Sequence, residues 1–330
     1  MQTVRWGILG TGRMAAVVAA EIAAMRSQGV ELAAVGSRRL NTARAFADRY
    51  GVPKAWDRAA DLASDPTVDV VYVATPHSVH CEHMLACLDA GKPVLCEKPF
   101  TLNAHEASRV IAAARSRQLF AMEAMWTRFL PAVAALRELL ASNAIGRVQM
   151  VVGGGAFIPD VAPGHYLLDR ALGGGVLLDA GVYLVSMASM ILGPPSRILA
   201  SGRLGGSGVD EQDAIVLEHR DGSNALLYVS LRARRAPDLE IMGEAGRIRV
   251  AAPIFKPARL TVWAADGSES TRQYPISGSG YGYQILAVSE ALRAGRIESP
   301  VMPLDETLSI MQTLDAVRRQ ISLHYPGEQP

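Results

Sequence analysis

The opening of the chain constrains the fold more than any other segment. A short apolar run, residues 4–9, breaks into Gly10-Thr11-Gly12 and then into an alanine-rich helical pattern. The two glycines allow a tight turn and a close approach of the backbone to a ligand, and Ala15 lets the following helix pack near the strand. The pattern predicts a strand, a turn and a helix whose free N–H groups face a pyrophosphate. An ordinary glycine turn is the alternative, because G-x-G-x-x-A alone is a weak signal.

The turn after the second apolar segment indicates which nucleotide the chain prefers. Residues 30–36 have the pattern of a strand, and it ends in Ser37 and Arg38. A carboxylate at such a strand end would accept hydrogen bonds from an adenosine ribose and repel a 2′-phosphate. A serine hydroxyl and a guanidinium instead donate hydrogen bonds to that phosphate. The segment therefore predicts NADP rather than NAD, with a solvated basic turn as the alternative.

Strand and helix patterns alternate from the first residues to about residue 125. This alternation predicts parallel strands joined by right-handed crossovers, with helices on both faces of the sheet. The run from Val68 to Ala74 is almost wholly apolar, which is typical of a strand buried on both faces. The predicted strands are residues 4–9, 30–36, 68–74, 93–96 and 119–122, and the predicted helices are residues 13–27, 41–50, 77–90 and 103–117.

The sequence changes in character beyond Arg128. Alternating or β-branched segments, separated by turns such as Asp221-Gly222, predict a mostly antiparallel sheet. The predicted fold class is an α/β Rossmann domain with a parallel sheet, residues 1–125, which binds NADP. It is followed by an α+β domain, residues 126–330, with a mostly antiparallel open sheet and helices, which binds the substrate. The helices predicted in this second part are residues 130–142, 172–192, 281–294 and 304–323, and the last two pack on the sheet or return to the first domain.

Composition argues against several classes of protein. The 330 residues are 49% hydrophobic, which suits two globular domains. A net charge of +1 argues against nucleic acid or an anionic membrane as a partner. The first residues lack the pattern of a cleaved signal, and no run reaches the ~18 apolar residues of a membrane span, so we expect a soluble, cytoplasmic protein. The three cysteines, Cys81, Cys87 and Cys96, form no C-x-x-C pair and are expected to be reduced thiols.

Three polar residues are candidates for chemistry. Lys98 follows a buried strand, between Glu97 and Pro99, at the edge where open α/β sheets bind ligands. Asp179 and Tyr183 are four residues apart in an apolar segment, so a helix would place them on one face. The structural alternatives are a solvated lysine, an aspartate that caps a helix and a tyrosine that fills the core.

Several short motifs occur in order along the chain. One set comprises Gly10-Thr11-Gly12, Thr75-Pro76 with His80, Glu97-Lys98-Pro99, and the triple-glycine segment that leads to Asp179 and Tyr183. Another set comprises Ser37-Arg38, residues 123–131, Tyr183 and residues 280–283. By the first set the chain resembles, over nearly its whole length, the glucose-fructose oxidoreductase, inositol dehydrogenase and rhizopine catabolism (Gfo/Idh/MocA) family. By the second it is most similar to the branch of the dimeric trans-dihydrodiol dehydrogenases and NADP-dependent D-xylose dehydrogenases.

The resemblance implies hydride transfer between NADP and a carbinol or carbonyl carbon of a sugar, polyol or cyclic diol, with Lys98, Asp179 and Tyr183 at the substrate. An alcohol that loses a hydride also loses a proton, so a base must lie within hydrogen-bond reach of its hydroxyl. Tyrosine has an ordinary pKa of ~10, and a nearby ammonium favours its phenolate. We therefore expect Tyr183 to be the proton donor and acceptor, assisted by Lys98. Proton transfer by Lys98 itself is the alternative.

The resemblance also implies a homodimer formed through the C-terminal sheet. Two groups of site residues follow from it and from the motifs. The cofactor is expected to contact Gly10, Thr11, Gly12, Arg13, Met14, Ser37, Arg38, Thr75, Pro76, His80, Glu97, Lys98, Trp126 and Arg128. The substrate is expected to contact Trp126, Phe157, His165, Tyr166 and Tyr281.

Other functions fit parts of the pattern. His77, His80 and His83 fan over too wide an arc of a helix for a compact metal site, so we predict none. The basic stretch 232–235 is expected to be a solvated face rather than a nucleic-acid site. A non-catalytic NADP-binding sensor is an alternative function, although such a protein would not need Lys98 and Tyr183 together. A sugar–sugar oxidoreductase with tightly bound NADP is another.

Overall fold

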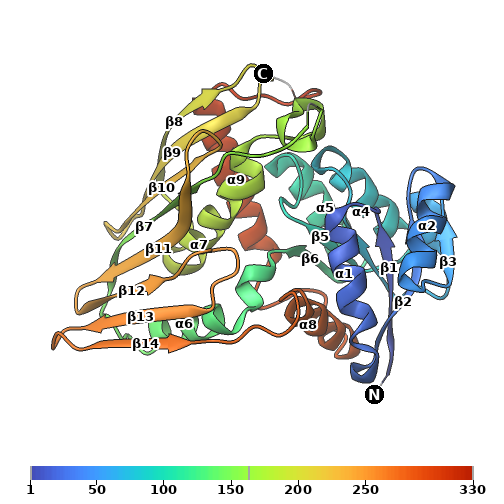
Figure 1. Cartoon of the computed structure of the whole chain (residues 1–330), viewed down its shortest axis with the longest axis horizontal. Coiled ribbons are helices and arrows are strands. Elements are labelled where there is room, and N and C mark those ends of the chain that lie inside the picture. The colour runs from blue at the N-terminus through green and yellow to red at the C-terminus, as the bar shows by residue number, and fades with distance from the viewer. Residues whose placement is uncertain (1, 163, 329–330) are drawn as a thin grey trace. The chain divides into compact units, whose positions relative to one another are not determined.

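The chain forms two compact units, each with its own sheet (Figure 1). The computed structural model describes residues 2–162 and 164–328. The predicted fold class, a parallel-sheet Rossmann domain and a mostly antiparallel sheet with helices, is confirmed. Unit 1 comprises Met1–Trp126 and Ser277–Leu308, and unit 2 comprises Thr127–Ile276 and Ser309–Pro330.

Unit 1 is built on a six-stranded sheet with the order β3-β2-β1-β4-β5-β6. Every neighbouring pair of strands in it is parallel. All four residues of β4 are buried, as expected of a strand covered on both faces. The strands are β1 (Val4–Leu9), β2 (Val30–Gly36), β3 (Lys54–Trp56), β4 (Val70–Val73), β5 (Val94–Glu97) and β6 (Ala121–Ala124).

Local hydrogen bonds and glycines determine where the helices of unit 1 begin and end. The Asn103 side chain accepts the N–H of Glu106 at 2.9 Å, which satisfies a free donor at the start of α5. Gly51 ends α2 with φ at 64°, a left-handed conformation that favours glycine. The helices are α1 (Arg13–Ala23), α2 (Leu40–Tyr50), α3 (Ala59–Ser64), α4 (His80–Asp89), α5 (Ala104–Ser116) and α8 (Gly282–Arg293).

Two short elements, β3 and α3, are not evident from the sequence. With three and six residues, neither is long enough to show a periodic pattern. The predicted helix 13–27 ends at Ala23, and a 3₁₀ turn, Arg26–Gln28, follows it. The predicted helix 77–90 likewise begins with a 3₁₀ turn, His77–Val79. Tighter turns at helix ends satisfy backbone groups that have no partner within the helix.

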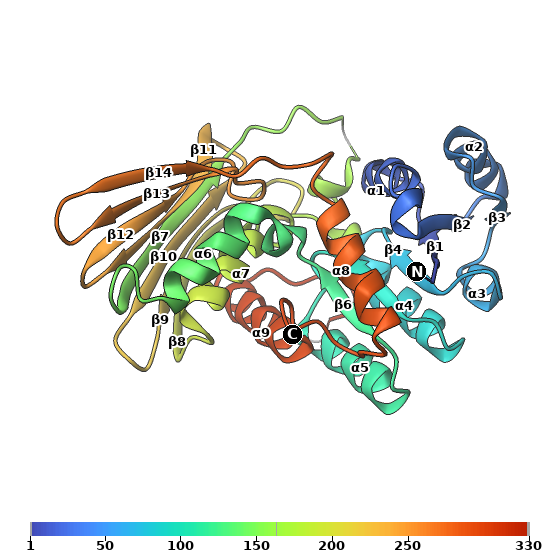
Figure 2. The ribbon, with the colours of Figure 1, turned by 90° about the horizontal axis from the view of Figure 1, so that it is seen from below.

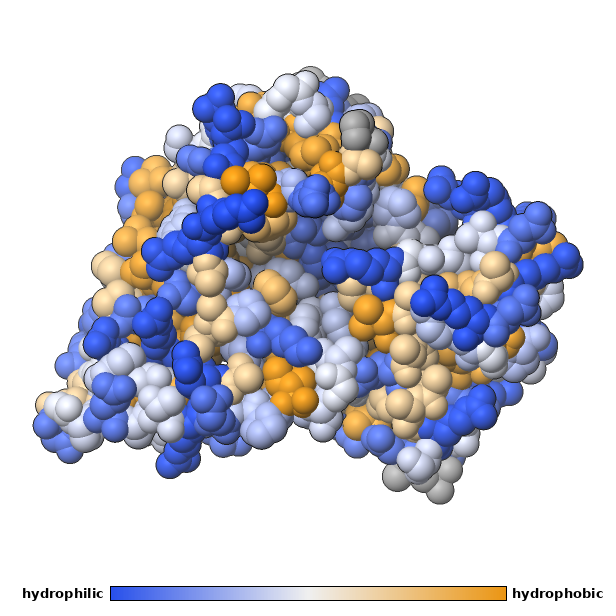
Figure 3. Space-filling view, viewed as in Figure 1, coloured by the Kyte–Doolittle hydropathy of each residue, from blue (hydrophilic) through white to orange (hydrophobic). Residues whose placement is uncertain are grey.

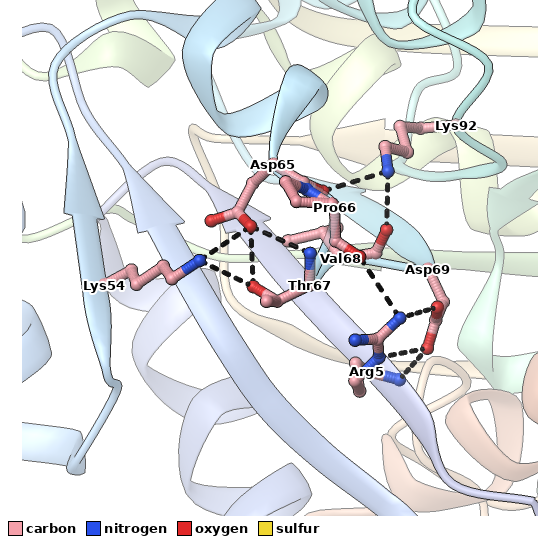
Figure 4. Close-up of polar contacts among 8 residues, drawn as sticks. All are labelled: Arg5, Lys54, Asp65, Pro66, Thr67, Val68, Asp69 and Lys92. Carbon is pink, nitrogen blue, oxygen red and sulfur yellow. Dashed lines mark hydrogen bonds and ion pairs between the residues drawn. The ribbon is translucent and has the colours of Figure 1, made fainter.

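Charged side chains tie the loop before β4 to its surroundings (Figure 4). The Arg5 guanidinium on β1 donates to the Asp69 carboxylate at 2.7 Å. The Lys92 ammonium donates to the carbonyl oxygens of Asp65 and Val68, at 3.0 and 2.8 Å. The loop is thus fixed at the edge of the sheet where β1 and β4 begin, opposite the edge at which ligands of such sheets bind.

Asp65 is the buried centre of this network. Its carboxylate accepts hydrogen bonds from the Lys54 ammonium at 2.9 Å, the Thr67 hydroxyl at 2.6 Å and the Trp56 indole at 3.2 Å. Burial raises the pKa of Asp65, but these donors outweigh burial and lower the pKa to about 2. The folded value lies below the ordinary value of 3.8. The ionised carboxylate therefore stabilises the fold above about pH 4, and this contribution is lost as the pH falls from about 4 to 2.

The substitution Asp65→Asn is expected to lower the free energy of unfolding at neutral pH by about 2 kcal/mol. It is also expected to reduce the further loss of stability between about pH 4 and 2. Urea unfolding at a series of pH values measures both effects. Asp61→Asn is the control, because the Asp61 carboxylate is exposed and lies 4.0 Å from Arg58. The same acid sensitivity in wild type and Asp65→Asn would show that this network does not govern acid stability.

Unit 2 is built on an eight-stranded sheet with the order β14-β13-β12-β11-β7-β10-β9-β8. Strands β7 and β10 are parallel, and all other neighbours are antiparallel. Helices α6 (Pro131–Ala141) and α7 (Val182–Leu192) lie on one face of this sheet (Figure 2). The boundary between the units falls within α9 (Leu304–Gln320). The strands are β7 (Val148–Ala156), β8 (Arg197–Leu204), β9 (Asp210–Glu218), β10 (Asn224–Ser230), β11 (Arg235–Gly243), β12 (Gly246–Val250), β13 (Arg259–Ala264) and β14 (Glu269–Gln273).

One apolar stretch, Arg170–Leu192, is long enough to cross a membrane and contains a window with a mean hydropathy of 1.8. Asp179 and Tyr183 interrupt it, so the sequence shows no continuous apolar run of that length. In the structure 67% of this window is buried inside the protein, and α7 packs against β7 and β10. The core helix of a globular domain has the same length and composition, so the stretch is accounted for by the core of unit 2.

The face of the sheet away from α7 carries exposed apolar side chains. Cross-strand pairing aligns Val152, Leu226, Val216 and Leu199 in one row across β7, β10, β9 and β8. Leu226 and Leu199 are 39% and 40% exposed. These residues line a shallow hollow of about 430 Å³, and apolar residues gather along the left margin of Figure 3, beside β7 and β10. We call the surface formed by these four residues the open face.

Candidate active site

Unit 1 places Gly10 where the strand order of its sheet reverses. The chain continues from β1 to β2 on one side, and β4 lies on the other side of β1. Open α/β sheets bind ligands at such a point. Gly10 has φ at 116°, and a Cβ atom there would collide with the carbonyl oxygen of Ala74. Glycine is therefore required for the turn from β1 into α1.

The N-terminus of α1 is open to an anion. Gly12 caps the helix without a side-chain hydrogen bond, no acidic residue lies in its first turn, and a Cβ atom at Gly12 would meet nothing within 4 Å. The hydroxyls of Thr11 and Ser37 lie 3.4 Å apart, after β1 and β2. The next residue, Arg38, is exposed, as is Arg13 in the first turn of α1. Free N–H groups, two hydroxyls and guanidinium groups are donors that fit the phosphates of a dinucleotide.

His80 is buried and joins two loops at this edge of the sheet. Its Nδ1 lies 2.9 Å from the carbonyl oxygen of Pro99, and its Nε2 lies 2.9 Å from that of Thr75. Burial lowers the pKa of His80 to about 4, although these carbonyl groups act in the opposite direction, so the ring is neutral. The ring therefore ties the Thr75-Pro76 loop to the loop that follows Lys98.

Lys98 directly follows β5, and its side chain is half-buried. The preceding Glu97 is 5% exposed and accepts a hydrogen bond from the Tyr72 hydroxyl of β4. Burial, and then the charge of Glu97, raise the pKa of Tyr72 well above its ordinary value, so the hydroxyl remains a donor. On the other side of Lys98, the N–H of Phe100 donates to buried Glu123 at 3.1 Å. The backbone around Lys98 is thus held by buried carboxylates on both sides.

Met14, Trp126 and Tyr281 lie together in unit 1. The rings of Trp126 and Tyr281 are stacked, with centroids 4.3 Å apart and planes inclined by 17°. The Tyr281 hydroxyl lies 4.0 Å from the sulfur of Met14 in the first turn of α1. Glu21 fixes the loop before α8, since it accepts the N–H of Ser279 at 2.9 Å. The sequence gives no sign of Glu21, because an isolated acidic residue on a helix does not reveal a partner far along the chain.

In unit 2, Asp179 and Tyr183 lie where the helix changes type. Leu177–Gly181 form a π-helical turn, and α7 begins at Val182. The predicted single helix, residues 172–192, is therefore wrong in this detail, and Asp179 and Tyr183 do not have the α-helical spacing that the sequence predicts. Such π turns are rare and frequently occur at functional sites.

Two aromatic residues contact this pair. The Tyr166 hydroxyl donates to Asp179 at 3.0 Å, and the Tyr166 ring packs against His165 with centroids 4.6 Å apart. The Phe255 ring lies 6.0 Å from that of Tyr183. Unit 2 thus brings together two expected substrate residues with Asp179. Phe255 is not predicted, although an aromatic residue between two prolines, Pro253 and Pro257, is the sequence signal that could have indicated it.

Arg128 and Phe157 have different surroundings. The Arg128 side chain is 1% exposed, and its Nε and Nη2 donate to the hydroxyl and the carbonyl oxygen of Ser186 at 2.9 and 2.6 Å. Arg128 therefore holds α7, the helix that carries Tyr183. Phe157 directly follows β7 and is 38% exposed.

Among the residues that the structure describes, no three histidine, cysteine, aspartate or glutamate side chains are grouped to hold a metal ion. His83 lies instead 3.0 Å from the Thr75 hydroxyl. Cys81 and Cys87 are buried, and burial raises the pKa of Cys87 to about 12. These thiols are therefore un-ionised and chemically inert at neutral pH.

Both units match known families. Residues 4–125 match an oxidoreductase family with an NAD-binding Rossmann fold, and residues 133–249 match the GFO/IDH/MocA C-terminal domain. The chain is 34% identical over 337 residues to trans-1,2-dihydrobenzene-1,2-diol dehydrogenase of Bos taurus, with 98% of each chain covered. The predicted family thus extends across nearly the whole chain.

Solved structures share the architecture. A 3-ketoreductase from Actinomadura kijaniata, in complex with NADP and TDP-benzene, has a TM-score of 0.87 and 26% identity over 97% of this chain and 98% of its own. A levoglucosan dehydrogenase in complex with NADH and levoglucosan has a TM-score of 0.88 and 20% identity, with 97% of each chain covered. The chain therefore belongs to the Gfo/Idh/MocA family of oxidoreductases, enzymes with an NAD-binding Rossmann domain.

Proposed function

We propose that this chain is an NADP-dependent dehydrogenase or reductase that acts on a sugar, a polyol or a cyclic diol. The observation that carries the proposal is the Asp179–Tyr183 pair at a π-helical turn, in a chain that also has the glycine turn of a dinucleotide site. The names of the relatives support the substrate class, since the bovine protein is a dehydrogenase of a cyclic diol. When bound, the nicotinamide ring accepts or donates the hydride.

Tyr183 is the proposed proton donor and acceptor. In the oxidation direction its phenolate takes the proton of the substrate hydroxyl, and in the reduction direction its phenol returns a proton to the carbonyl oxygen. The Lys98 ammonium favours the phenolate and stabilises negative charge on the substrate oxygen. Asp179 is proposed to accept a hydrogen bond from a second substrate hydroxyl, because the hydrogen bond from Tyr166 orients its carboxylate and a carboxylate accepts several hydrogen bonds at once.

The proposed cofactor and substrate residues follow the sequence prediction with three changes: His80 and Arg128 are no longer proposed as cofactor contacts, and one substrate residue is added. His80 is proposed to act indirectly, because its ring is bonded to the backbone of Thr75 and Pro99. Arg128 is also proposed to act indirectly, because its side chain is bonded to Ser186 of α7. Phe255 is added to the substrate residues. The proposed cofactor contacts are Gly10, Thr11, Gly12, Arg13, Met14, Ser37, Arg38, Thr75, Pro76, Glu97, Lys98 and Trp126, and the proposed substrate contacts are Trp126, Phe157, His165, Tyr166, Phe255 and Tyr281.

A substitution of Arg38, just after β2, tests the preference for NADP over NAD. Arg38→Ala is expected to weaken NADPH binding by about tenfold or more, the effect of losing one charge-assisted hydrogen bond to the 2′-phosphate. NADH binding is expected to stay unchanged. Titration of nicotinamide fluorescence measures both affinities, and Arg39→Ala, a change at the exposed neighbouring residue, is the control. Equal affinities for the two nucleotides, unaffected by Arg38→Ala, would contradict the preference.

The activity itself is tested with a panel of aldoses, inositols and cyclic diols in the presence of NADP, by the absorbance of the reduced nicotinamide. Turnover of at least one class is expected. Tight NADPH binding without turnover of any class would favour a sensor instead. Nucleotide that survives purification and is recycled between two sugars would indicate a sugar–sugar oxidoreductase.

We also propose that the protein is a homodimer formed through the open face. The row of Val152, Leu226 and Leu199 exposes apolar area that a second copy would bury. Leu226→Asp is expected to shift the protein to a monomer in sedimentation equilibrium. Thr261→Asp, on the more polar half of the sheet, is the control and should leave the dimer intact. A monomeric wild type would rule out this assembly.

We propose a cytoplasmic location because the three cysteines are free thiols. Cys81, Cys87 and Cys96 are free and buried. Free thiols in a globular protein are typical of a reducing compartment, where disulfides are rare. Microscopy of the full chain with a fluorescent tag tests this proposal, and fluorescence at the cell envelope or outside the cell would contradict it.

A further inference from the structure

A turn with three glycines, Gly173–Gly175, leads into the π-helical turn that carries Asp179. Gly175 has φ at 118°, and a Cβ atom there would overlap the Oδ1 of Asp210 on β9. The Oδ2 of Asp210 accepts the N–H of Leu177 at 2.6 Å. Asp210 therefore holds the backbone at the start of the π-helical turn, and it can approach so closely only because residue 175 is glycine.

Asp210 has a second buried carboxyl group as its neighbour. Asp213, on the same strand, is 1% exposed, and its carboxyl group lies close enough to that of Asp210 for each to affect the ionisation of the other. If both were ionised, the Oδ1 of Asp210 and both oxygens of Asp213 would lack a donor. Two adjacent buried carboxylates repel each other, whereas one shared proton converts the repulsion into a strong hydrogen bond. Gly202 pairs with Asp213 across β8 and β9, and a Cβ atom at Gly202 would collide with Oδ1 of Asp213 and with Ile321.

The C-terminal residues hold the other side of the glycine turn. The Tyr325 hydroxyl is buried and donates to the carbonyl oxygen of Gly174 at 2.7 Å. The Arg318 guanidinium lies 4.9 Å from the centre of the Tyr325 ring. Glu328 accepts hydrogen bonds from Arg318 at 2.7 Å and from the N–H of Tyr325 at 2.9 Å. Tyr325 is thus fixed by its own neighbours, which makes its hydroxyl a rigid donor to the turn.

We propose that Asp210 and Asp213 share one proton and, together with Tyr325, position the turn Gly173–Gly175 so that Tyr183 is correctly placed for proton transfer. This inference rests on the proposed function, because its effect on catalysis passes through Tyr183. Asp210, with Asp213 beside it, holds the N–H of Leu177, and Tyr325 holds the carbonyl group of Gly174. None of the three residues needs to touch the substrate, so they are positioning residues.

The protonation of the pair is consistent with its surroundings. Burial, and then the charge of Asp210, raise the pKa of Asp213 to about 9, so Asp213 carries the proton at neutral pH. Burial also raises the pKa of Asp210, against hydrogen bonds from Asp213 and the backbone. Tyr325 lies close enough to the pair for the charges of both aspartates to act on it, and Arg318 and Glu328 act on Tyr325 as well. Because the pKa of Asp213 is higher in the folded state than its ordinary value of 3.8, this group destabilises the fold progressively as the pH rises from about 4 to 9.

Substitutions of Asp213 test the shared proton. Asp213→Ala leaves Asp210 without its donor and is expected to lower kcat by about tenfold. Asp213→Asn imitates the protonated acid, since its amide donates to Asp210 and never ionises, and is expected to recover most of the lost kcat. The stability of Asp213→Asn relative to wild type is expected to increase with pH across the neutral range. Asp266→Asn, in an exposed turn, is the control.

Substitution of Tyr325 tests the other side of the turn. Tyr325→Phe removes the hydroxyl and keeps the ring beside Arg318, and it is expected to lower kcat about fivefold with an unchanged KM for NADPH. Tyr274→Phe is the matched control. A Tyr325→Phe enzyme that unfolds at a lower temperature but keeps the wild-type kcat would assign Tyr325 a purely structural role and overturn the proposal.

Two further measurements do not need turnover. Amide hydrogen exchange in residues 173–183 is expected to be faster in Asp213→Ala and Tyr325→Phe, and close to wild type in Asp213→Asn. The infrared band of a protonated carboxylic acid is expected in wild type at neutral pH and absent in Asp213→Asn. If no substrate is turned over, the proposed function fails while these measurements still decide on the positioning. Unchanged exchange in all three variants, or the absence of the acid band in wild type, would overturn the inference.

Discussion

Replacement of Tyr183 by phenylalanine is expected to lower kcat for the best substrate by about 10²–10⁴-fold, the usual contribution of a general acid or base. The Tyr183 side chain is only 9% exposed, and its ring lies 6.0 Å from that of Phe255, so phenylalanine keeps the ring in place and removes only the hydroxyl. Affinity for NADPH is expected to stay at the wild-type value, because the proposed nucleotide contacts all lie in unit 1. Steady-state kinetics in both directions, with an NADPH titration, measure these effects.

Two companion variants separate the roles of the neighbouring residues. Lys98→Met is expected to lower kcat and to move the rise of the oxidation rate to higher pH, because without the ammonium the phenol loses its proton less easily. Tyr166→Phe removes one hydrogen bond to Asp179 and is expected to cost no more than about tenfold in kcat. If Tyr183→Phe were as active as wild type while Lys98→Met were inactive, Lys98 rather than Tyr183 would carry the proton.

The architecture could be predicted from the sequence because its periodic signals are strong. The apolar run through β4 and the glycine turn at Gly10 indicate a buried parallel strand and a tight turn by composition alone. Short elements do not carry such a signal. The three residues of β3 contain less than two periods of a strand pattern, and the six of α3 less than two periods of a helical pattern, so neither element can be recognised from periodicity.

The candidate site could be predicted only as a set of residues, not as an arrangement. Asp179 and Tyr183 were expected on one continuous helix, but a π-helical turn lies between Leu177 and Gly181. One extra residue in a helical turn changes neither composition nor hydrophobicity, so the sequence gives no sign of it. A partner outside the helix bonds to the first residue of this turn, since Asp210 on β9 accepts the backbone N–H of Leu177.

Partners that are distant in the sequence are the other feature that a single sequence does not reveal. Glu21 bonds to a loop more than 250 positions away, and Tyr325 bonds to Gly174 about 150 positions away. Each of these residues is unremarkable in its own segment. Glu21 bonds to the loop before Tyr281 in unit 1, and Tyr325 bonds to the turn before Asp179 in unit 2.

Gly10→Ala is expected to have the other large effect. Its φ of 116° is unfavourable for alanine, and the added Cβ would collide with the carbonyl oxygen of Ala74. Strain and overpacking together are expected to lower the free energy of unfolding by about 3 kcal/mol. NADPH affinity is expected to fall at least about 100-fold, because the shifted turn would lose two charge-assisted hydrogen bonds to the nucleotide. Chemical unfolding and nucleotide titration measure the two losses separately.

Gly12→Ala distinguishes damage to the backbone from loss of the space that the nucleotide is proposed to fill. Gly12 has φ at −79° and ψ at −172°, a conformation that any residue adopts, and its added Cβ would meet no protein atom within 4 Å. Stability is therefore expected to change by no more than about 0.5 kcal/mol. A pyrophosphate seated at the N-terminus of α1 would meet that Cβ, so NADPH affinity is expected to fall while the fold stays intact. If Gly12→Ala bound NADPH as tightly as wild type, the nucleotide would have to bind elsewhere, and the cofactor contacts proposed from Gly10 to Met14 would be wrong.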